Sequence, residues 1–534
     1  MWRDSRAFGR AVAVCLAVVA VSCSSDSETS PAQETANDRG GAAAPPGGGP
    51  PGEGGPPPAW IIDSMAEPRG VVVSRPEVSP GYVLFEPLLG ATTYLLDVQG
   101  RVVHTWTHPT AGGSHYLLQD GSLLRGTRLP EPPGFRAGGV GGGLLRKTWE
   151  GELTWQWQLA NERRILHHDI EPLPNGNILA IAWELKTPEE ARRAGRRADS
   201  TPEQGLWSEW LLEIEPLPPD DARIVWEWHL WDHLVQSHDP EADNYGDPSR
   251  EPGRLDVNGD RDAPIVDEEE LARLKALGYV PDDATPEDLQ SDFLHMNSVD
   301  YDATLDQIAV SNPEIGELWI LDHSTTTEQA RGSTGGRSGR GGEILYRWGN
   351  PKLCGRGEKE DQQLFYQHQV EWVPEGWPGA GNLTVFNNGG DGPPGEWSSV
   401  LEIAPPLAAD GSYALEPSAP FGPAAPAWSY TAAVKETFYA PFISGAHRLL
   451  GGNTFICSGP QGRLMEVTPE GQVVWELRSP FRGKAPGWVP PMAEQFKYGI
   501  YRARKLSPDH PGLAGRPLWP LEPQPPVDPD GAGS

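Results

Sequence analysis

The stretch Tyr366-Gln367-His368-Gln369-Val370-Glu371-Trp372-Val373-Pro374-Glu375-Gly376 decides how the whole chain is interpreted. After its histidine, apolar and polar side chains alternate, and the run closes on a Pro-Glu-Gly turn signal. This pattern predicts a β-strand that leads into a hairpin.

Two further segments, residues 165–176 and 293–303, repeat this layout. The first carries His168 eight residues before the turn glycine, and the second carries His295 and ends on Asp-Ala where the others have a turn pair. We expect the three histidines, at equivalent places in three repeats of one architecture, to converge on the axis that relates the repeats.

A second pattern recurs six times, as a turn residue followed by a strand whose aromatic residues are two apart and so lie on one face. Six such strands, each closing a small group of strands, predict an all-β protein with a six-bladed β-propeller and insertions. An all-β sandwich with Trp-rich hairpins is the alternative, but the repetition of two linked patterns favours the propeller. The six copies cover residues 100–106, 151–157, 222–228, 342–348, 427–430 and 471–477.

The composition agrees with a long, turn-rich β protein. The chain has 534 residues, with 63 Gly, 56 Pro and 21 Trp, and few long segments show helical periodicity. Its formal net charge of −31 argues against a nucleic-acid partner, because phosphate neutralisation needs basic patches. The same charge means that any anion site must be a local cluster of Arg and His.

The chain begins with a predicted export signal over residues 1–23. Three arginines precede an apolar core that is too short to span a bilayer. The segment ends on Ala-Val-Ser-Cys23, which resembles a bacterial lipoprotein box with Cys23 as the lipidated residue; a plain secretory signal is the alternative. Either one predicts an exported protein, periplasmic or anchored to the outer membrane. Membrane contact is expected only through a lipid at Cys23.

Three further regions follow the signal. Residues 24–58 are rich in Gly, Pro and Ser and are expected to form a disordered linker, and residues 507–534 form a Pro-rich, irregular tail. The propeller is predicted over residues 59–506. Its largest insertion, residues 229–294, is expected to contain a short helix over 267–278, which is acidic at its start and ends on Gly.

The insertion also contains a weak candidate for a structural calcium site. Its carboxylate and amide residues alternate as in calcium loops, but the bidentate Glu is missing, so a solvated acidic loop is the favoured interpretation. Two cysteines, Cys354 and Cys457, lie in the predicted propeller and either pair or remain separate buried thiols. The calcium candidates are Asp256, Asn258, Asp260 and Asp262.

The three histidines of the repeats are the candidates for chemistry, because propellers bind ligands in the funnel at their axis. Three imidazoles would suit a zinc site. They would equally suit a nucleophile with two acid–base partners, because neutral imidazole is both a nucleophile and a proton shuttle. The residues alone leave both interpretations open. His115 and His447 lie nearer the turns and are weaker candidates.

The stretches His168-Asp169, His295-Met296-Asn297-Ser298-Val299-Asp300-Tyr301 and Gln367-His368 resemble the signatures of the bacterial arylsulfate sulfotransferase family. The resemblance covers roughly residues 80–480. It implies a six-bladed, exported, PAPS-independent enzyme that moves a sulfuryl group from an aryl sulfate ester to a phenol. It further implies ping-pong kinetics and no required cofactor.

Carried over residue by residue, the resemblance makes His368 the nucleophile that becomes a sulfohistidine. His168 and His295 would assist proton transfer and hold the sulfuryl oxygens, and Asn297 would add a hydrogen bond. The family also carries an Arg on the strand after the His-x-Asn motif, where this chain reads Ser311-Asn312-Pro313-Glu314. A cation from another blade is therefore expected, with Arg347 and Arg463 as the substrate-binding candidates and Arg448 as a further one.

A second departure from the family is Gln369, where Asp is usual after the nucleophilic histidine. Three other functions therefore stay open. One is a non-catalytic propeller that binds a ligand or partner through its funnel, and another is an enzyme with a His-ligated metal. A quinone-cofactor dehydrogenase ranks last, because the blade signature of that class is absent. The sequence predicts no oligomeric state.

Overall fold

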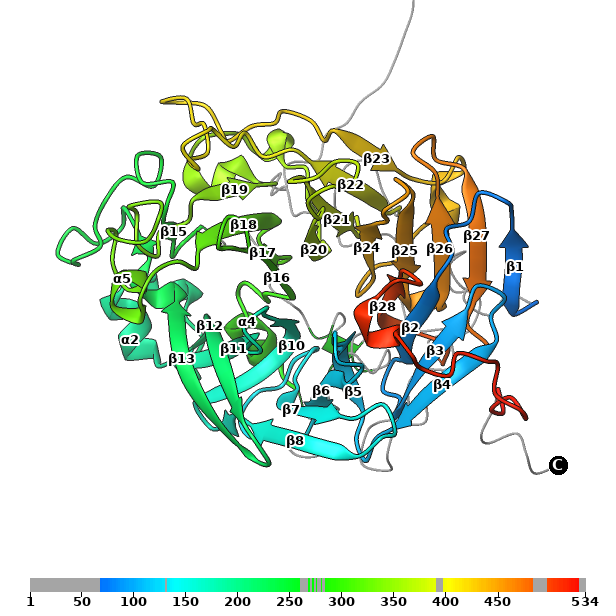
Figure 1. Cartoon of the computed structure of the whole chain (residues 1–534). Helices are drawn as coiled ribbons and strands as arrows, with labels where there is room; N and C mark the ends of the chain where they lie inside the picture. Colours follow the sequence, from blue (N-terminus) through cyan, green and yellow to red (C-terminus); the bar gives the residue numbers. More distant parts are fainter. Residues whose placement is uncertain are drawn as a thin grey trace, which may run out of the picture. The chain divides into compact units, whose positions relative to one another are not determined.

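Six small antiparallel sheets are arranged as the blades of a six-bladed β-propeller in the computed structural model (Figure 1). The structure describes residues 68–129, 132–259, 284–389, 397–483 and 497–527, with a few single residues between 260 and 283. The predicted fold class is therefore confirmed.

Each blade has four strands, and two blades carry a fifth. From the innermost strand outward, blade 1 is β28 (Ile500–Leu506), β2 (Tyr82–Pro87), β3 (Thr92–Asp97) and β4 (Val102–Thr107), and blade 2 is β5 (Gly112–Leu117), β6 (Leu123–Arg128), β7 (Gly142–Lys147) and β8 (Leu153–Gln158). Blade 3 is β10 (Arg164–Pro172), β11 (Ile178–Lys186), β12 (Leu206–Leu217) and β13 (Asp221–His229), with β9 (Ala160–Asn161) on the other edge of β10.

The second half of the ring follows the same order. Blade 4 is β16 (Ser298–Asp302), β17 (Gln307–Asn312), β18 (Glu317–Asp322) and β19 (Tyr346–Trp348). Blade 5 is β20 (His368–Trp372), β21 (Leu383–Asn387), β22 (Ser399–Ile403) and β23 (Trp428–Tyr430). Blade 6 is β24 (Gly445–Arg448), β25 (Thr454–Ser458), β26 (Arg463–Val467) and β27 (Val473–Arg478), with β1 (Gly70–Ser74) outside β27.

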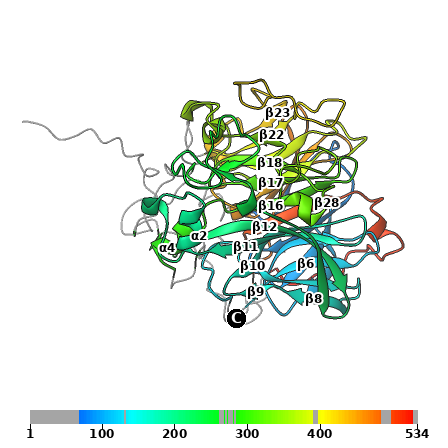
Figure 2. The ribbon, with the colours of Figure 1, turned by 90° about the vertical axis from the view of Figure 1, so that its left-hand side faces the viewer.

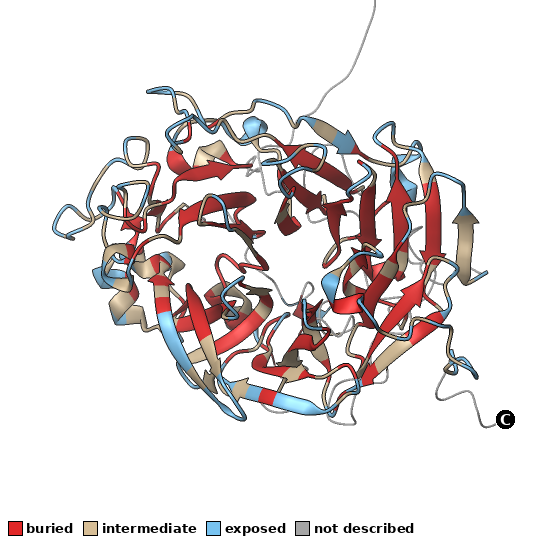
Figure 3. Cartoon of the chain, in the orientation of Figure 1, coloured by how far each residue is buried: buried red, intermediate tan, exposed pale blue. Residues whose placement is uncertain are grey.

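The innermost strands form a closed ring, in which each contacts the innermost strand of the next blade. The ring is closed by both ends of the described chain. β28 pairs antiparallel with β2, with Leu506 opposite Tyr82, and β1 pairs with β27, with Gly70 opposite Arg478. Figure 3 shows the inner strands buried, while β8 and β13 at the periphery are largely exposed.

The six aromatic strands predicted from the sequence are the fourth strands β4, β8, β13, β19, β23 and β27. A tryptophan on each donates its indole N–H to a backbone carbonyl just before or at the start of the fourth strand of the following blade. This cyclic set of hydrogen bonds explains why the aromatic pattern recurs once per blade. The pairs are Trp106 to Thr148, Trp155 to Asp221, Trp228 to Gly342, Trp348 to Pro423, Trp428 to Pro469 and Trp475 to Val98, with distances of 2.7–3.1 Å.

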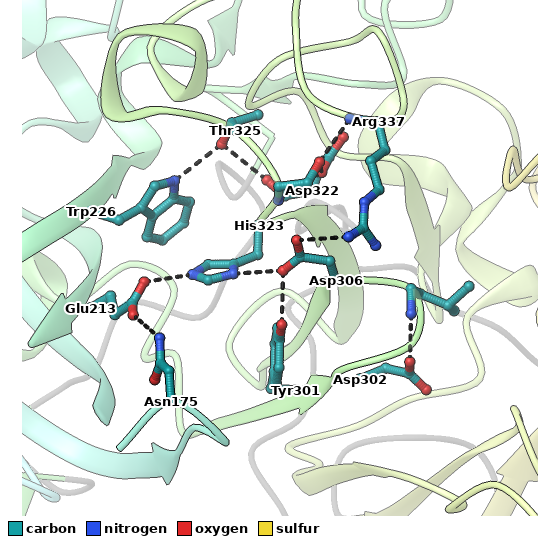
Figure 4. A network of polar contacts seen from close by, with 12 residues as sticks. Asn175, Glu213, Trp226, Tyr301, Asp302, Asp306, Asp322, His323, Thr325 and Arg337 are labelled. Atoms are coloured by element: carbon teal, nitrogen blue, oxygen red, sulfur yellow. Dashed lines mark hydrogen bonds and ion pairs between the residues drawn. The ribbon is translucent and has the colours of Figure 1, made fainter. Parts of the chain in front are cut away.

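A polar network locks blades 3 and 4 together (Figure 4). The ring of His323 lies between two carboxylates, with Nε2 3.1 Å from Glu213 and Nδ1 2.9 Å from Asp306. Tyr301 donates its hydroxyl to Asp306 at 2.8 Å. Burial opposes a charge on His323, but the two hydrogen bonds outweigh it and raise its pKa. The network therefore acts as an inter-blade ion cluster.

The helices are short and lie outside the sheets. α2 (Pro188–Arg193) contacts β11 and α4 (Pro286–Ser291) contacts β12, and Figure 2 shows both helices beside this blade. α5 is Thr327–Ala330, and the two-stranded parallel sheet of β14 (Leu234–Val235) and β15 (Leu255–Asp256) lies in the insertion. The 3₁₀ turns are Ala198–Ser200, Leu230–Asp232, Pro351–Cys354, Lys359–Asp361, Lys435–Thr437, Gly459–Gln461 and Pro511–Leu513.

Several predicted features lie outside the described residues, namely the export signal, Cys23, the linker over 24–58 and most of the helix over 267–278. In the described part of the tail, the side chain of Leu513 is buried and Gln524 hydrogen-bonds to the backbone of Val102. Cys354 and Cys457 are separate, buried thiols. Within the described ranges no helix is long and apolar enough to cross a bilayer.

The calcium candidates are described only in part. Asp256 accepts the backbone N–H of Asn258, whose side chain donates to the Gly195 carbonyl at 3.0 Å. Asp260 and Asp262 lie outside the described residues. Across those parts of the chain that the structure covers, no group of three or more His, Cys, Asp or Glu side chains is arranged to hold a metal ion.

Candidate active site

Three histidines from three blades lie together, with His168 inside β10, His295 three residues before β16 and His368 at the start of β20. His168 and His295 lie edge to face, with ring centroids 4.4 Å apart and planes at 77°. His168 and His368 both line a cavity of about 120 Å³. In addition to burial, the charge of His295 lowers the pKa of His168 and of His368.

The backbone that presents these side chains is strained. His168 and His295 have φ of +48° and +55°, and Gln369, which follows His368, has φ of +49°. The strand register also shifts between His167 and Ile170 and between His368 and Glu371, so both inner strands carry a bulge here. A left-handed backbone at a non-glycine residue destabilises the fold by about 1–3 kcal/mol, and a bulge changes the direction of a side chain. The strained backbone therefore serves to direct the histidine side chains toward one another.

Hydrogen bonds fix the tautomer of His368. Its Nδ1 lies 2.9 Å from the Tyr366 carbonyl and 2.9 Å from the Asn388 side-chain oxygen, which are both acceptors. Nδ1 therefore carries the proton. The lone pair is on Nε2, which accepts the backbone N–H of Ile443 at 3.2 Å. Burial, together with the charge of His295, lowers the pKa of His368 to about 3, so the ring is neutral near pH 7.

His295 is protonated, whereas His368 is neutral, because of Asp292, which lies three residues earlier. Its Nδ1 makes a short hydrogen bond to the Asp292 carboxylate, and both side chains are almost completely buried. Burial opposes the protonated form, but the charge and hydrogen bond of Asp292 outweigh it and raise the pKa of His295 to about 9. The sequence prediction missed Asp292, although the spacing Asp-x-x-His was visible.

Behind His168 lies a chain of hydrogen bonds that the sequence prediction also missed. Nδ1 of His168 is 2.8 Å from Nδ1 of His167, and Nε2 of His167 is 3.1 Å from Glu209 on β12. The His167 ring stacks on Trp183 with centroids 3.9 Å apart. Burial and the charge of Asp292 raise the pKa of Glu209 well above its usual range, which favours the protonated carboxyl.

The direction of these hydrogen bonds follows the protonation state of Glu209. In its protonated form Glu209 donates to His167, whose Nδ1–H then donates to Nδ1 of His168. Burial, with the charge of His295, holds the pKa of His168 well below its ordinary value, so this ring is neutral. Its single proton is therefore on Nε2.

Arg502 is a further group that the sequence prediction missed. It comes from β28 and makes an ion pair of 2.5 Å with Asp169. Asp169 also accepts the backbone N–H of Val299 at 3.1 Å, so it joins blades 3, 4 and 1. The side chain of Asn297 donates to the Gln367 carbonyl at 2.8 Å and thus holds the main chain next to His368.

The other predicted site residues lie elsewhere. Arg347 on β19 is buried against Glu317, and Arg463 on β26 pairs with Glu476 at 2.9 Å. Arg448 at the end of β24 pairs with Glu402. Each of these arginines pairs with a carboxylate of its own blade or of the neighbouring blade. The structure therefore does not bring them to the histidines. His115 and His447 are buried on β5 and β24.

On the side of blade 2, glycine backbone forms the cavity wall. A Cβ added at Gly139, which has φ of +75°, would lie 2.1 Å from Cε1 and Nε2 of His168. The peptide backbone therefore packs directly on the histidine ring. Apolar side chains and one cation complete the lining. These residues include Leu88, Leu89, Arg128, Leu144 and Phe442.

Comparison with known proteins places this site in context. The arylsulfotransferase (ASST) family model matches residues 90–479. No curated protein matches the chain. Among solved structures it is similar to a protein of unknown function from Bacteroides caccae, with 10% identity, 80% of this chain and 99% of that chain covered, and a TM-score of 0.39.

Two further solved structures show a similar distant likeness. One is a putative 6-phosphogluconolactonase from Bacteroides fragilis, with 7% identity, coverage of 80% of this chain and 98% of that chain, and a TM-score of 0.34. The other is the Cps50 (Swd1) β-propeller domain from Myceliophteria thermophila, with 12% identity, coverage of 78% and 91%, and a TM-score of 0.33. Likenesses at this level say nothing about substrate or chemistry.

Proposed function

Because the chain belongs to the arylsulfotransferase family, we propose that it moves a sulfuryl group from an aryl sulfate ester to a phenol. The observation that carries this proposal is the pairing of a neutral histidine, His368, which lines the cavity, with a protonated one, His295, whose ring packs against the cavity-lining His168. Group transfer through a covalent intermediate needs this combination of a nucleophile and an acid.

In the first half-reaction, Nε2 of His368 gives up its hydrogen bond from the Ile443 N–H and attacks the sulfur atom, and the bond from sulfur to the aryl oxygen breaks. The sulfuryl group moves to Nε2, and the ring becomes cationic. Nδ1–H remains hydrogen-bonded to the Tyr366 carbonyl and Asn388, which stabilises that charge. His295 gives its proton to the departing phenolate oxygen, so a neutral phenol leaves and His295 becomes neutral.

The second half-reaction reverses these roles. A phenol gives its proton to neutral His295 while its oxygen attacks the sulfur atom, and the bond from sulfur to Nε2 of His368 breaks. His295 is protonated again, and His368 returns to its neutral state. In both steps the N–H of His168, fixed by Glu209 and His167, donates to a sulfuryl oxygen. The scheme predicts ping-pong kinetics.

Mass spectrometry of the trapped intermediate tests this proposal. The protein is mixed with 4-nitrophenyl sulfate without acceptor, and the peptide that contains His368 is expected to gain a sulfuryl group that added phenol removes. His368→Ala should gain none, whereas a variant of the exposed His238, His238→Ala, should behave like the wild type. Folded wild-type protein that releases no 4-nitrophenol in the presence of phenol would contradict the proposal.

A further inference from the structure

Arg128, the last residue of β6, lines the same cavity as His168 and His368 and differs from the other arginines near the centre of the ring. Those arginines are neutralised, Arg125 by Glu86 and Arg504 by Glu371. In the described ranges no carboxylate or other acceptor contacts the Arg128 guanidinium, and only its backbone N–H is bonded, to Ala111 at 2.9 Å.

An unpaired, partly buried guanidinium is costly. Burial lowers the pKa of Arg128, yet an arginine keeps its charge under all ordinary conditions. Removing a cation from water without a partner therefore destabilises the fold. No described residue supplies that partner, and the side chain lines the cavity, so an anionic ligand in the cavity is the partner that fits.

We propose that Arg128 binds the sulfate oxyanion of the donor ester and so supplies the cation that the strand after the His-x-Asn motif lacks. This inference rests on the proposed function and extends it, because it names the group that recognises the anionic end of the substrate. A guanidinium fork offers two parallel N–H donors to two oxygens of one oxyanion. The donor ester is thereby anchored before His368 attacks.

The cavity offers contacts for both ends of an aryl sulfate. Leu88, Leu89 and Phe442 are apolar lining residues that suit a ring, and Arg128 is a cation of the same lining that suits the sulfate. The position expected for a cation is occupied by Ser311 and Asn312, which are completely buried on β17. Neither carries a charge, so the cation has to come from another blade.

Binding measurements on a protein that cannot turn over test this inference. In a His368→Ala background, isothermal titration calorimetry with 4-nitrophenyl sulfate is compared for Arg128 and Arg128→Met. We expect binding to weaken roughly ten- to hundredfold, as for the loss of a charge-assisted hydrogen bond. Binding of neutral 4-nitrophenol should stay the same, and Arg128→Lys should restore part of the affinity.

Arg146→Met is the matched control, because it removes a positive charge from the same blade at a side chain that pairs with Asp120. It should leave both affinities unchanged, and thermal unfolding verifies that every variant is folded. Three outcomes would overturn the inference: no loss with Arg128→Met, an equal loss for 4-nitrophenol, or a loss confined to esters with a carboxylate on the ring. Arg128-dependent binding without any turnover by the wild type would instead refute the proposed function alone.

Discussion

The ring centroids of His168 and His295 lie 4.4 Å apart although the two residues belong to different blades. One ring is neutral and the other is protonated. Burial and the charge of His295 keep the pKa of His168 well below its ordinary value, whereas Asp292 outweighs burial and raises the pKa of His295 to about 9. The cluster therefore contains one proton donor that is charged near pH 7 beside two neutral rings.

Asp292→Asn should slow the enzyme according to how poor the leaving group is. Without its carboxylate partner, His295 loses its proton near neutral pH and no longer protonates the departing phenolate. We expect kcat/KM to fall about 10²-fold for phenyl sulfate, and less than about tenfold for 4-nitrophenyl sulfate, whose phenolate leaves without help. Steady-state rates with both donors provide the measurement.

Asp302→Asn is the matched control for this change, because Asp302 ends β16, the strand that follows Asp292 in the chain, and accepts two backbone N–H groups of a turn, where Asn forms the same hydrogen bonds. Equal losses with the two donors would mean that Asp292 supports the fold and does not position an acid.

The pH profile of sulfation by phenyl sulfate should be a plateau with two limbs. The acid His295 is needed in its protonated form, so the rate falls as the pH rises through about 9. The nucleophile His368 is needed in its neutral form, so the rate falls as the pH drops through about 3. Asp292→Asn should move the upper limb down toward the ordinary histidine pKa of about 6.5. Single-turnover release of phenol without acceptor gives the profile, and an upper limb that stays in place would refute the assignment.

Gly139→Ala should damage activity far more than stability. The new Cβ would meet the His168 ring, so the ring has to move, and we expect kcat/KM to fall about 10²-fold. Gly151→Ala introduces the same left-handed strain, at φ of +88°, with no atom within 4 Å. Both variants should lose about 1 kcal/mol in urea unfolding, and only Gly139→Ala should lose activity. Comparable activities in the two variants would show that His168 is not held by this contact.

Trp475→Phe tests the cyclic tryptophan bonds. It removes the indole N–H that donates to the Val98 carbonyl at 2.8 Å and leaves that carbonyl without its partner. We expect a loss of about 1–3 kcal/mol in the free energy of unfolding, measured with guanidinium chloride. The control Trp519→Phe, at a side chain that is 79% exposed, should change it by less than about 0.5 kcal/mol. Equal effects would mean that the bond between these blades is dispensable.

The sequence predicted those parts of the molecule that repeat. The fourth strands were recognised because each must supply a tryptophan to the next blade, and this requirement imposes a period on the chain. The prediction that the three histidines share one register follows the same logic, since inner strands that surround one axis begin at equivalent places.

The residues that tune the site could not be predicted in this way. Glu209 and Arg502 lie far from the histidines along the chain, and they reach them only through tertiary contacts, Glu209 within blade 3 and Arg502 from blade 1. Arg128 looks like any polar residue at the end of an alternating strand, and only the cavity and the missing partner distinguish it. Arg347 and Arg463 were predicted as the cation because a sequence does not show which arginines are already neutralised.

The closing strand β28 has a consequence for biosynthesis. It is the last strand that the structure describes, yet it forms the innermost layer of the first blade and brings Tyr501 to the cavity and Arg502 to Asp169. A nascent polypeptide that has not yet left the ribosome as far as residue 506 lacks this wall, however well its earlier blades have folded. A chain that stops before β28 would therefore leave the proposed active site incomplete.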